Sequence, residues 1–176
     1  IETGVTSSYH FLLNSENYNL LSKNSRVIVL EIASMGHEIA LHFDLSAYEH
    51  NKKNKELQRQ ISFLQDIAQQ EIISISFHNP SIYQNNELNI EEKYHGCLNT
   101  YSSYFNQYFS YVSDSRGHFR EKDILRKIQQ KHFNNLHFLM HPIWWVYMPS
   151  DRNQKLHSLV KAKCDALAEN ILSGYE

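Results

Sequence analysis

Gly36-His37-Glu38-Ile39-Ala40-Leu41-His42-Phe43-Asp44 is the stretch that decides the fold of this chain. Glycine adopts a positive φ without a steric penalty, so Gly36 predicts the end of a preceding amphipathic helix. The six residues after His37 are too few for another helix, and they predict a buried strand over 38–43. We therefore expect a helix, a tight turn, a strand and an active-site loop, with His42 delivered to a pocket.

His37 and His42 do not form the His-Glu-x-x-His motif of zinc proteases. That motif places two histidines four positions apart on one helical face, whereas these two are five positions apart. A spacing of five fits neither one face of a helix nor one face of a strand. We interpret His37 as a turn residue and His42 as the functional residue.

The bulk composition is that of one globular domain over residues 1–176, with 41% hydrophobic and 20% charged residues. A formal net charge of −2 provides no basic field for phosphates, which argues against a nucleic-acid partner. No apolar run approaches the roughly 20 residues that span a bilayer. Cys97 and Cys164 lack metal-binding spacing, which favours reduced thiols and a cytoplasmic location.

Histidine and tyrosine are abundant, with eleven residues of each type. Both types suit a wet, partly apolar cleft of the kind that binds sugars and metals. Several histidines have no evident partner nearby in the sequence, and we interpret these as surface residues: His10, His50, His95, His118, His132 and His157.

Strands and helices are predicted to alternate along the chain. The predicted strands are 6–13, 38–43, 72–77, 108–113 and 136–140, and the predicted helices begin near residues 22, 57, 121 and 151. In the first helix, the residues spaced to face the core are Val27, Leu30, Ala33 and Ser34. Residues 81–107 show little periodicity, and we expect a long functional loop with one short helix there.

The alternation predicts an α/β fold with a parallel sheet and helices outside it. Serine and alanine at alternate strand positions suit the narrow inner face of a small barrel. In such a barrel, reactive groups collect at the carboxyl ends of the strands. Four successive predicted strands end in His42, His78, Asp114 and His141. Each could be an ordinary turn residue, but the four together indicate an active site.

Four motifs carry a resemblance to a known family. They are Gly36–Asp44, Ser76-Phe-His-Asn-Pro-Ser81, Tyr111-Val-Ser-Asp-Ser-Arg-Gly117 and Leu139-Met-His-Pro-Ile-Trp-Trp145. Together they resemble the polysaccharide deacetylase superfamily in its O-antigen-type branch. The four motifs occur in the family's order and cover most of the chain. The resemblance implies a deformed or partial (β/α) TIM-like barrel. It also implies a divalent metal, usually zinc, that activates water to hydrolyse an N-acetyl or O-acetyl group on a sugar.

The resemblance also implies roles for single residues. His42 matches the metal-binding histidine, and His141 matches the late histidine that acts as general acid. Asp114 and Arg116 occupy the position of groups that orient the catalytic pair, and we count Arg116 among the substrate-binding residues. His78 stands where many relatives have arginine, and it is a candidate second metal ligand or oxyanion contact.

An aromatic segment follows His141. Trp144, Trp145 and Tyr147 would offer flat apolar faces to a sugar ring. The tryptophan pair is equally compatible with a hydrophobic plug over the barrel, because tryptophan is bulky and often mostly buried.

The chain departs from the family pattern at two points. Ser46 stands where relatives have their second metal histidine, and the Asp-Asp motif of the first barrel strand is not found. We expect an amino-terminally shortened member of the family rather than a degenerate one. We accordingly expect the chain as given to bind metal weakly and to be poorly active.

The leading hypothesis is a metal-dependent deacetylase acting on a bacterial surface saccharide or its precursor. The alternative is a non-catalytic carbohydrate-binding barrel that has lost the metal chemistry, and a third possibility is a hydrolase of another bond. If His42 and His78 share a metal, their ring nitrogens should lie roughly 3 to 4 Å apart. All four strand-end residues should open on the same end of the barrel.

Overall fold

The computed structural model describes residues 4–79, 91–145 and 151–174. The chain forms two compact units, unit 1 over Ile1–Gln107 and unit 2 over Tyr108–Glu176. The expectation of a single domain over 1–176 stays a prediction.

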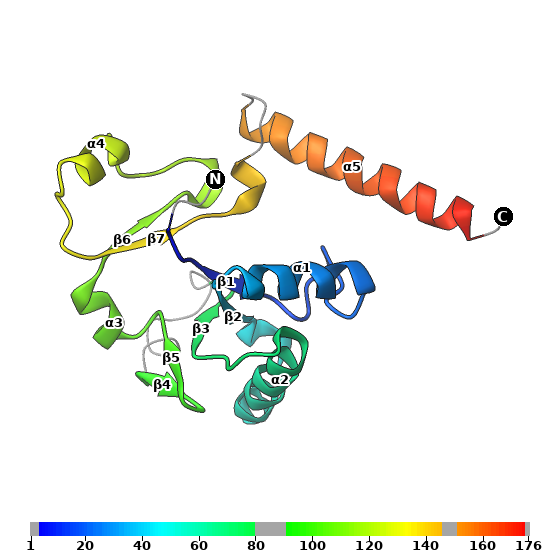
Figure 1. Cartoon of the computed structure of the whole chain (residues 1–176), viewed down its shortest axis with the longest axis horizontal. Coiled ribbons are helices and arrows are strands. Elements are labelled where there is room, and N and C mark those ends of the chain that lie inside the picture. The colour runs from blue at the N-terminus through cyan, green and yellow to red at the C-terminus, as the bar shows by residue number, and fades with distance from the viewer. Residues whose placement is uncertain (1–3, 80–90, 146–150, 175–176) are drawn as a thin grey trace. The chain divides into compact units, whose positions relative to one another are not determined.

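Unit 1 contains a five-stranded sheet in the order β1-β2-β3-β5-β4. Strands β1, β2, β3 and β5 run parallel, and β4 pairs antiparallel with β5. The elements in chain order are β1 (Ser8–Phe11), α1 (Lys23–Ser34), β2 (Glu38–Phe43), α2 (Lys53–Ala68), β3 (Ser74–Phe77), β4 (Lys93–Tyr94), β5 (Cys97–Asn99) and α3 (Ser103–Tyr108). The last residue of α3 is the first residue of unit 2. Short 3-10 turns lie at Leu45–Ala47 and His50–Lys52. Figure 1 shows these elements along the colour gradient.

Unit 2 is built on two parallel strands, β6 (Ser110–Ser113) and β7 (Leu136–Leu139). Helix α4 (Ile124–Gln129) lies between them in the chain, and α5 (Arg152–Ser173) follows. Short 3-10 turns occupy Ser115–Gly117 and Pro142–Trp144. The predicted mixed α/β class with parallel strands is confirmed across the described residues. A barrel is a finer prediction that these two sheets do not test.

The local signals around α1 explain its bounds. The Ser22 hydroxyl accepts a hydrogen bond from the backbone N of Ser25 at 3.2 Å, which caps the amino end. The helix ends at Ser34, and Gly36 follows with φ of +82°, as the sequence predicted. The predicted core face is wrong at Val27, which is 46% exposed, and at Ser34, which is also exposed. Val29 is buried instead, because the helix presents that position to the sheet.

One face of the unit 1 sheet carries the core. Its apolar side chains pack with those of α1 and α2 in a single cluster that includes Val29, Ile39, Leu41, Phe43, Leu57, Ile61, Leu64, Ile75 and Phe77. Because side chains alternate along a strand, the other face carries small and polar residues. Those residues are Ser8, His10, Glu38, Ala40, His42, Ser74 and Ser76.

Several features of the predicted secondary structure need correction. Helix α4 begins at Ile124 rather than near residue 121, and β1 covers Ser8–Phe11 rather than 6–13. Helix α2 begins at Lys53 rather than near residue 57. The sequence pattern missed the first turn of this helix, because that turn is polar and lacks the apolar spacing. Strands β4 and β5 lie inside the region expected to be a loop. The two residues that join them, His95 and Gly96, both have positive φ, as a tight hairpin turn requires. Within the described ranges, no helix combines the length and the apolar character needed to cross a membrane.

Candidate functional site

Unit 1 contains a chain of contacts that we name the histidine cluster, formed by His10, His42, Ser76, His78 and Asn79. Nδ1 of His42 lies 2.7 Å from Oγ of Ser76, and Nδ1 of His10 lies 2.8 Å from the same oxygen. Nε2 of His42 lies 3.3 Å from Nδ1 of His78. Nε2 of His78 lies 3.0 Å from Nδ2 of Asn79. Strands β1, β2 and β3, and the two residues that follow β3, therefore bring five polar side chains together.

Strand register accounts for this assembly. His42 on β2 pairs directly with Ser76 on β3, so their side chains project from the same face as neighbours. His10 on β1 pairs with Ala40 on β2. Because the alanine side chain is only a methyl group, the imidazole of His10 can reach over β2 to Ser76.

The pair formed by His42 and His78 is the part of the cluster that fits a metal. Two nitrogen ligands of a tetrahedral zinc ion at about 2.0 to 2.1 Å lie roughly 3.3 to 3.4 Å from each other. The measured 3.3 Å falls in that range and within the predicted interval. It also fits an N–H···N hydrogen bond. Across residues 4–79, 91–145 and 151–174, no group of three or more His, Cys, Asp or Glu side chains could hold a metal ion.

A carboxylate occupies the same sheet face. Oε1 of Glu38 accepts a hydrogen bond from Oγ of Ser74 at 2.5 Å, and Oε2 accepts one from the Ser8 hydroxyl. These contacts link β1, β2 and β3 at the end of the sheet opposite His78. Glu38 and the histidine cluster together make this face polar along its length.

Unit 2 contains the second group, the Asp114–His141 pair. Asp114 follows β6 and His141 comes two residues after the last residue of β7, so parallel pairing brings the two strand ends together. Oδ1 of Asp114 lies 2.6 Å from Nδ1 of His141, and the backbone N of His141 donates to both carboxylate oxygens at 3.0 Å. The Trp145 indole N–H donates to Oδ2 at 2.8 Å. Asp114 is 2% exposed, whereas the His141 side chain is 44% exposed.

A pocket of about 210 Å³ adjoins this pair within unit 2. Its lining consists of Asp114, Gly117, His118, Phe119, Trp144, Trp145 and Lys155. Trp145 is 57% exposed, so it is not a fully buried plug. Arg116 adopts φ of +69° and is not among the lining residues. Tyr147 lies outside the described residues.

The structure brings the predicted site residues together as two pairs, His42 with His78 and Asp114 with His141. The first pair belongs to unit 1 and the second to unit 2. The prediction that all four residues open on one end of a barrel stays a prediction.

The interpretation of several histidines as surface residues without partners is wrong for His10, which is partly buried and joins the histidine cluster through Ser76. His95 is exposed, as predicted, but it has a partner, since its Nε2 lies 2.9 Å from Oδ1 of Asn54. His118 is exposed, as predicted, and lines the unit 2 pocket. Strand parity could have found His10, because it shares a face with Ser8 on β1, and serine marks the polar face on β3 as well.

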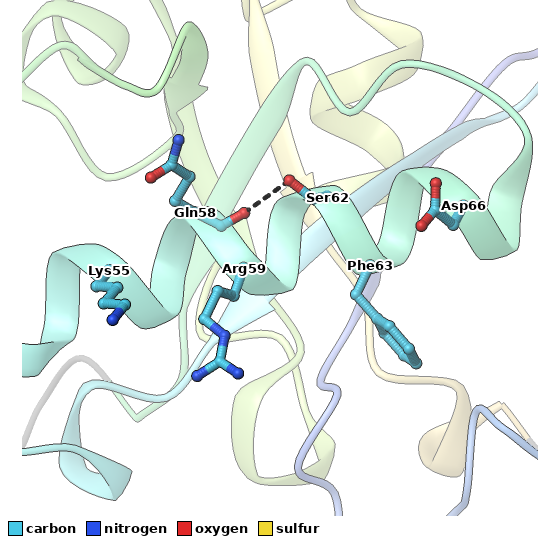
Figure 2. Close-up of a pocket in the computed structure, with 6 residues that line it drawn as sticks. All are labelled: Lys55, Gln58, Arg59, Ser62, Phe63 and Asp66. Atoms are coloured by element: carbon cyan, nitrogen blue, oxygen red, sulfur yellow. Dashed lines mark hydrogen bonds between the residues drawn. The ribbon is translucent and has the colours of Figure 1, made fainter.

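A larger hollow of about 420 Å³ lies on α2 and is not part of this site. Figure 2 shows that its lining side chains all project from this one helix. The Ser62 hydroxyl donates to the Gln58 carbonyl oxygen at 3.1 Å. Helix α2 packs on the apolar face of the sheet, whereas the histidine cluster projects from the polar face. The hollow therefore belongs to the outer surface of a core helix.

Compared with known proteins, the chain matches no family model and no curated protein. The function proposed below therefore depends on the site geometry and on the four sequence motifs.

Proposed function

We propose that this protein is a metal-dependent hydrolase that removes an N-linked or O-linked acetyl group from a bacterial surface saccharide or its precursor. The observation that carries the proposal is the contact between Asp114 and His141. A buried carboxylate bonded to Nδ1 of an exposed imidazole is an arrangement suited to general acid catalysis, because it fixes the ring and stabilises its protonated form.

The proposed role of His141 is to protonate the departing group. Asp114 accepts a hydrogen bond from Nδ1–H of His141, so Nε2 is the nitrogen that delivers a proton to the amine or alcohol as its bond to the acyl carbon breaks. Both Asp114 and His141 act as catalytic residues in this proposal.

His42 and His78 are the residues that would hold the divalent metal, and zinc suits imidazole ligands. When bound, such a metal lowers the pKa of a coordinated water toward about 7 and so supplies a nucleophile at neutral pH. The separation of the two ring nitrogens supports this assignment.

The substrate proposed for the unit 2 pocket is a sugar. Trp144, Trp145 and Phe119 offer apolar ring faces, and His118 and Lys155 offer polar groups at the same wall. Arg116 is retained as a substrate contact on the family resemblance alone.

The finer fold belongs to the same proposal. A deformed or partial (β/α) TIM-like barrel of the polysaccharide deacetylase type is supported by parallel strands in both units. Helices on one sheet face and small polar residues on the other give further support in unit 1.

A combined zinc and acetate assay tests the proposal against its rival. Purified protein is loaded with zinc, its metal content is measured, and acetate release from N-acetylated and O-acetylated saccharides is followed. Zinc uptake with acetate release supports the hydrolase. Saccharide binding without zinc or acetate release supports the non-catalytic carbohydrate-binding protein.

A further inference from the structure

We propose that the saccharide bound in the unit 2 pocket carries an acidic group, a carboxylate or a phosphate, and that the ammonium group of Lys155 binds it. The catalytic use of such a saccharide rests on the function proposed above, whereas its binding depends only on the residues that line the pocket. Lys155 is a specificity-determining residue in this arrangement and not a catalytic one.

Lys155 is held at the pocket wall by a contact with the neighbouring turn. It lies near the start of α5 and is partly buried. Its Nζ donates to the carbonyl oxygen of Trp144 at 2.5 Å, and both residues line the pocket. A lysine ammonium group has three N–H donors and no acceptor. One bond to a carbonyl oxygen therefore leaves two donors for a ligand.

The positive charge of Lys155 lacks a carboxylate partner among the residues that the structure describes. Asp151 lies one turn earlier, but its Oδ1 caps the helix by accepting from the backbone N of Gln154 at 2.9 Å. Asp165 is the next acidic residue along α5. It lies about 15 Å farther along the helix axis, which exceeds the Debye length of about 8 Å at physiological ionic strength. An anionic ligand would supply the charge that these side chains do not.

Asp114 contributes the acidic side chain of the pocket wall, and its charge is offset by its own partner. Its carboxylate contacts Nδ1 of His141 and accepts from the Trp145 indole. His141 must be protonated to act as a general acid, and the protonated ring balances the charge of Asp114. Lys155 then gives the pocket a net positive charge, which favours an anionic substrate.

Arg152 adds a second cationic residue beside the pocket. Gly117 lines the pocket, and a β-carbon added to it would lie 3.4 Å from Cγ and 3.5 Å from Cβ of Arg152. The side chain of Arg152 therefore begins beside the pocket wall, about one turn before Lys155 on α5. The start of this helix thus increases the positive charge around the pocket.

The aromatic lining and Lys155 match different parts of an acidic sugar. The ring faces of Phe119, Trp144 and Trp145 suit the apolar face of a sugar ring. The ammonium group suits a carboxylate or a phosphate attached to that ring. The smaller estimates for a hydrogen bond to a charged group correspond to about a tenfold gain in affinity. An acidic sugar should therefore bind more tightly than its neutral counterpart by about that factor.

The test is tryptophan fluorescence of the 176-residue chain titrated with glucose, glucuronate and glucose 6-phosphate. These sugars differ only at C6, which carries an alcohol, a carboxylate or a phosphate. Trp144 and Trp145 are the two tryptophans of the chain and both line the pocket, so binding should change their emission. We expect at least one acidic sugar to bind about tenfold more tightly than glucose, and added salt to reduce this preference. The tighter of the two acidic sugars identifies the acidic group.

Three variants assign the preference to Lys155. Lys155→Met removes the ammonium group and keeps an apolar stem, Lys155→Arg keeps the positive charge, and Lys161→Met removes an exposed lysine from the same helix. Loss of the bond to the Trp144 carbonyl would weaken all three sugars alike, so the readout is the ratio of acidic to neutral affinity. We expect acidic and neutral sugars to bind Lys155→Met equally, and the other two variants to keep the wild-type preference.

Equal affinity of wild type for glucose and both acidic sugars would overturn the proposal, and so would an unchanged preference in Lys155→Met or no binding of any of the three sugars. Acetate release is measured separately. If the preference depends on Lys155 but zinc-loaded protein releases no acetate, the hydrolase assignment fails and the acidic ligand stands. If acetate is released but neutral and acidic sugars bind equally, the hydrolase assignment stands and the acidic ligand fails.

Discussion

Oδ1 of Asp114 lies 2.6 Å from Nδ1 of His141, and both oxygens of that carboxylate also accept from the His141 backbone N at 3.0 Å. One buried side chain therefore fixes both the main chain and the imidazole of the residue proposed as the acid. The same carboxylate accepts from the Trp145 indole. Asp114 thus has a structural role in unit 2 as well as its proposed catalytic role.

Replacing Asp114 should destabilise unit 2. Asp114→Ala removes the acceptor for three donors, and donors left without a partner cost about 1 to 3 kcal/mol when buried. We expect a loss of about 2 to 3 kcal/mol in the free energy of unfolding, since the partly exposed His141 can recover hydrogen bonds to water.

Both tryptophans of the chain lie in unit 2, so their fluorescence during urea unfolding reports this unit. Asp165→Ala, an exposed carboxylate on α5, should change the value by less than about 0.5 kcal/mol. Equal effects of the two substitutions would contradict the structural role.

The stability of unit 2 should also depend on pH through His137. Burial lowers the pKa of His137 below its ordinary value of 6.5. In the pH range between these two values, the unfolded chain binds a proton at this position and the folded chain does not. The free energy of unfolding should therefore fall as the pH drops through about 6.5, and this contribution should stop changing below the folded pKa.

Substitution isolates that contribution. The difference in unfolding free energy between pH 7.5 and pH 5.5 should be smaller in His137→Gln than in wild type. His157→Gln changes an exposed histidine in the same unit and should leave the difference unaltered. A pH difference that is the same in wild type and His137→Gln would show that burial of His137 has no role.

Thiol reactivity should distinguish the two cysteines and report the folding of unit 1. Cys97 is 2% exposed and its thiol donates to the Ile72 carbonyl oxygen at 3.0 Å. Burial, with a smaller effect of Glu71, raises its pKa, so less of the reactive thiolate forms. Cys164 is exposed.

We expect a disulfide reagent to modify Cys164 in native buffer and Cys97 only in denaturant. We also expect the fast reaction to be absent from the Cys164→Ser variant. Equal rates for both thiols in native buffer would refute the buried position of Cys97.

The parts of the fold predicted best are those that local signals determine. Strand β2 was predicted with its observed bounds, because a glycine precedes it and an apolar run follows. Strands β4 and β5 were missed, because segments of two and three residues are too short to show a period. The core face of α1 was misplaced at Val27, since its sequence is apolar at several neighbouring positions and only packing selects Val29.

The same distinction applies to the site. The strand ends predicted that His42 and His78 lie close together, because parallel pairing brings such positions together whatever their distance in sequence. The direct contact between Asp114 and His141 was not predicted. His10 was interpreted as a surface residue, because its partner Ser76 is 66 positions away and the contact depends on strand order.

The most direct test of the proposed function is the rate of acetate release by zinc-loaded wild type and His141→Ala, measured on an acetylated saccharide at neutral pH. Zinc content is measured in the same samples, and His50→Ala serves as an exposed-histidine control. We expect wild type and the control to release acetate at equal rates and His141→Ala to be slower by about a hundredfold or more, as loss of a general acid requires. Zinc content should be the same in all three proteins. Because the chain as given is expected to be poorly active, the comparison is made at high protein concentration. Equal rates of acetate release by wild type and His141→Ala would contradict the account.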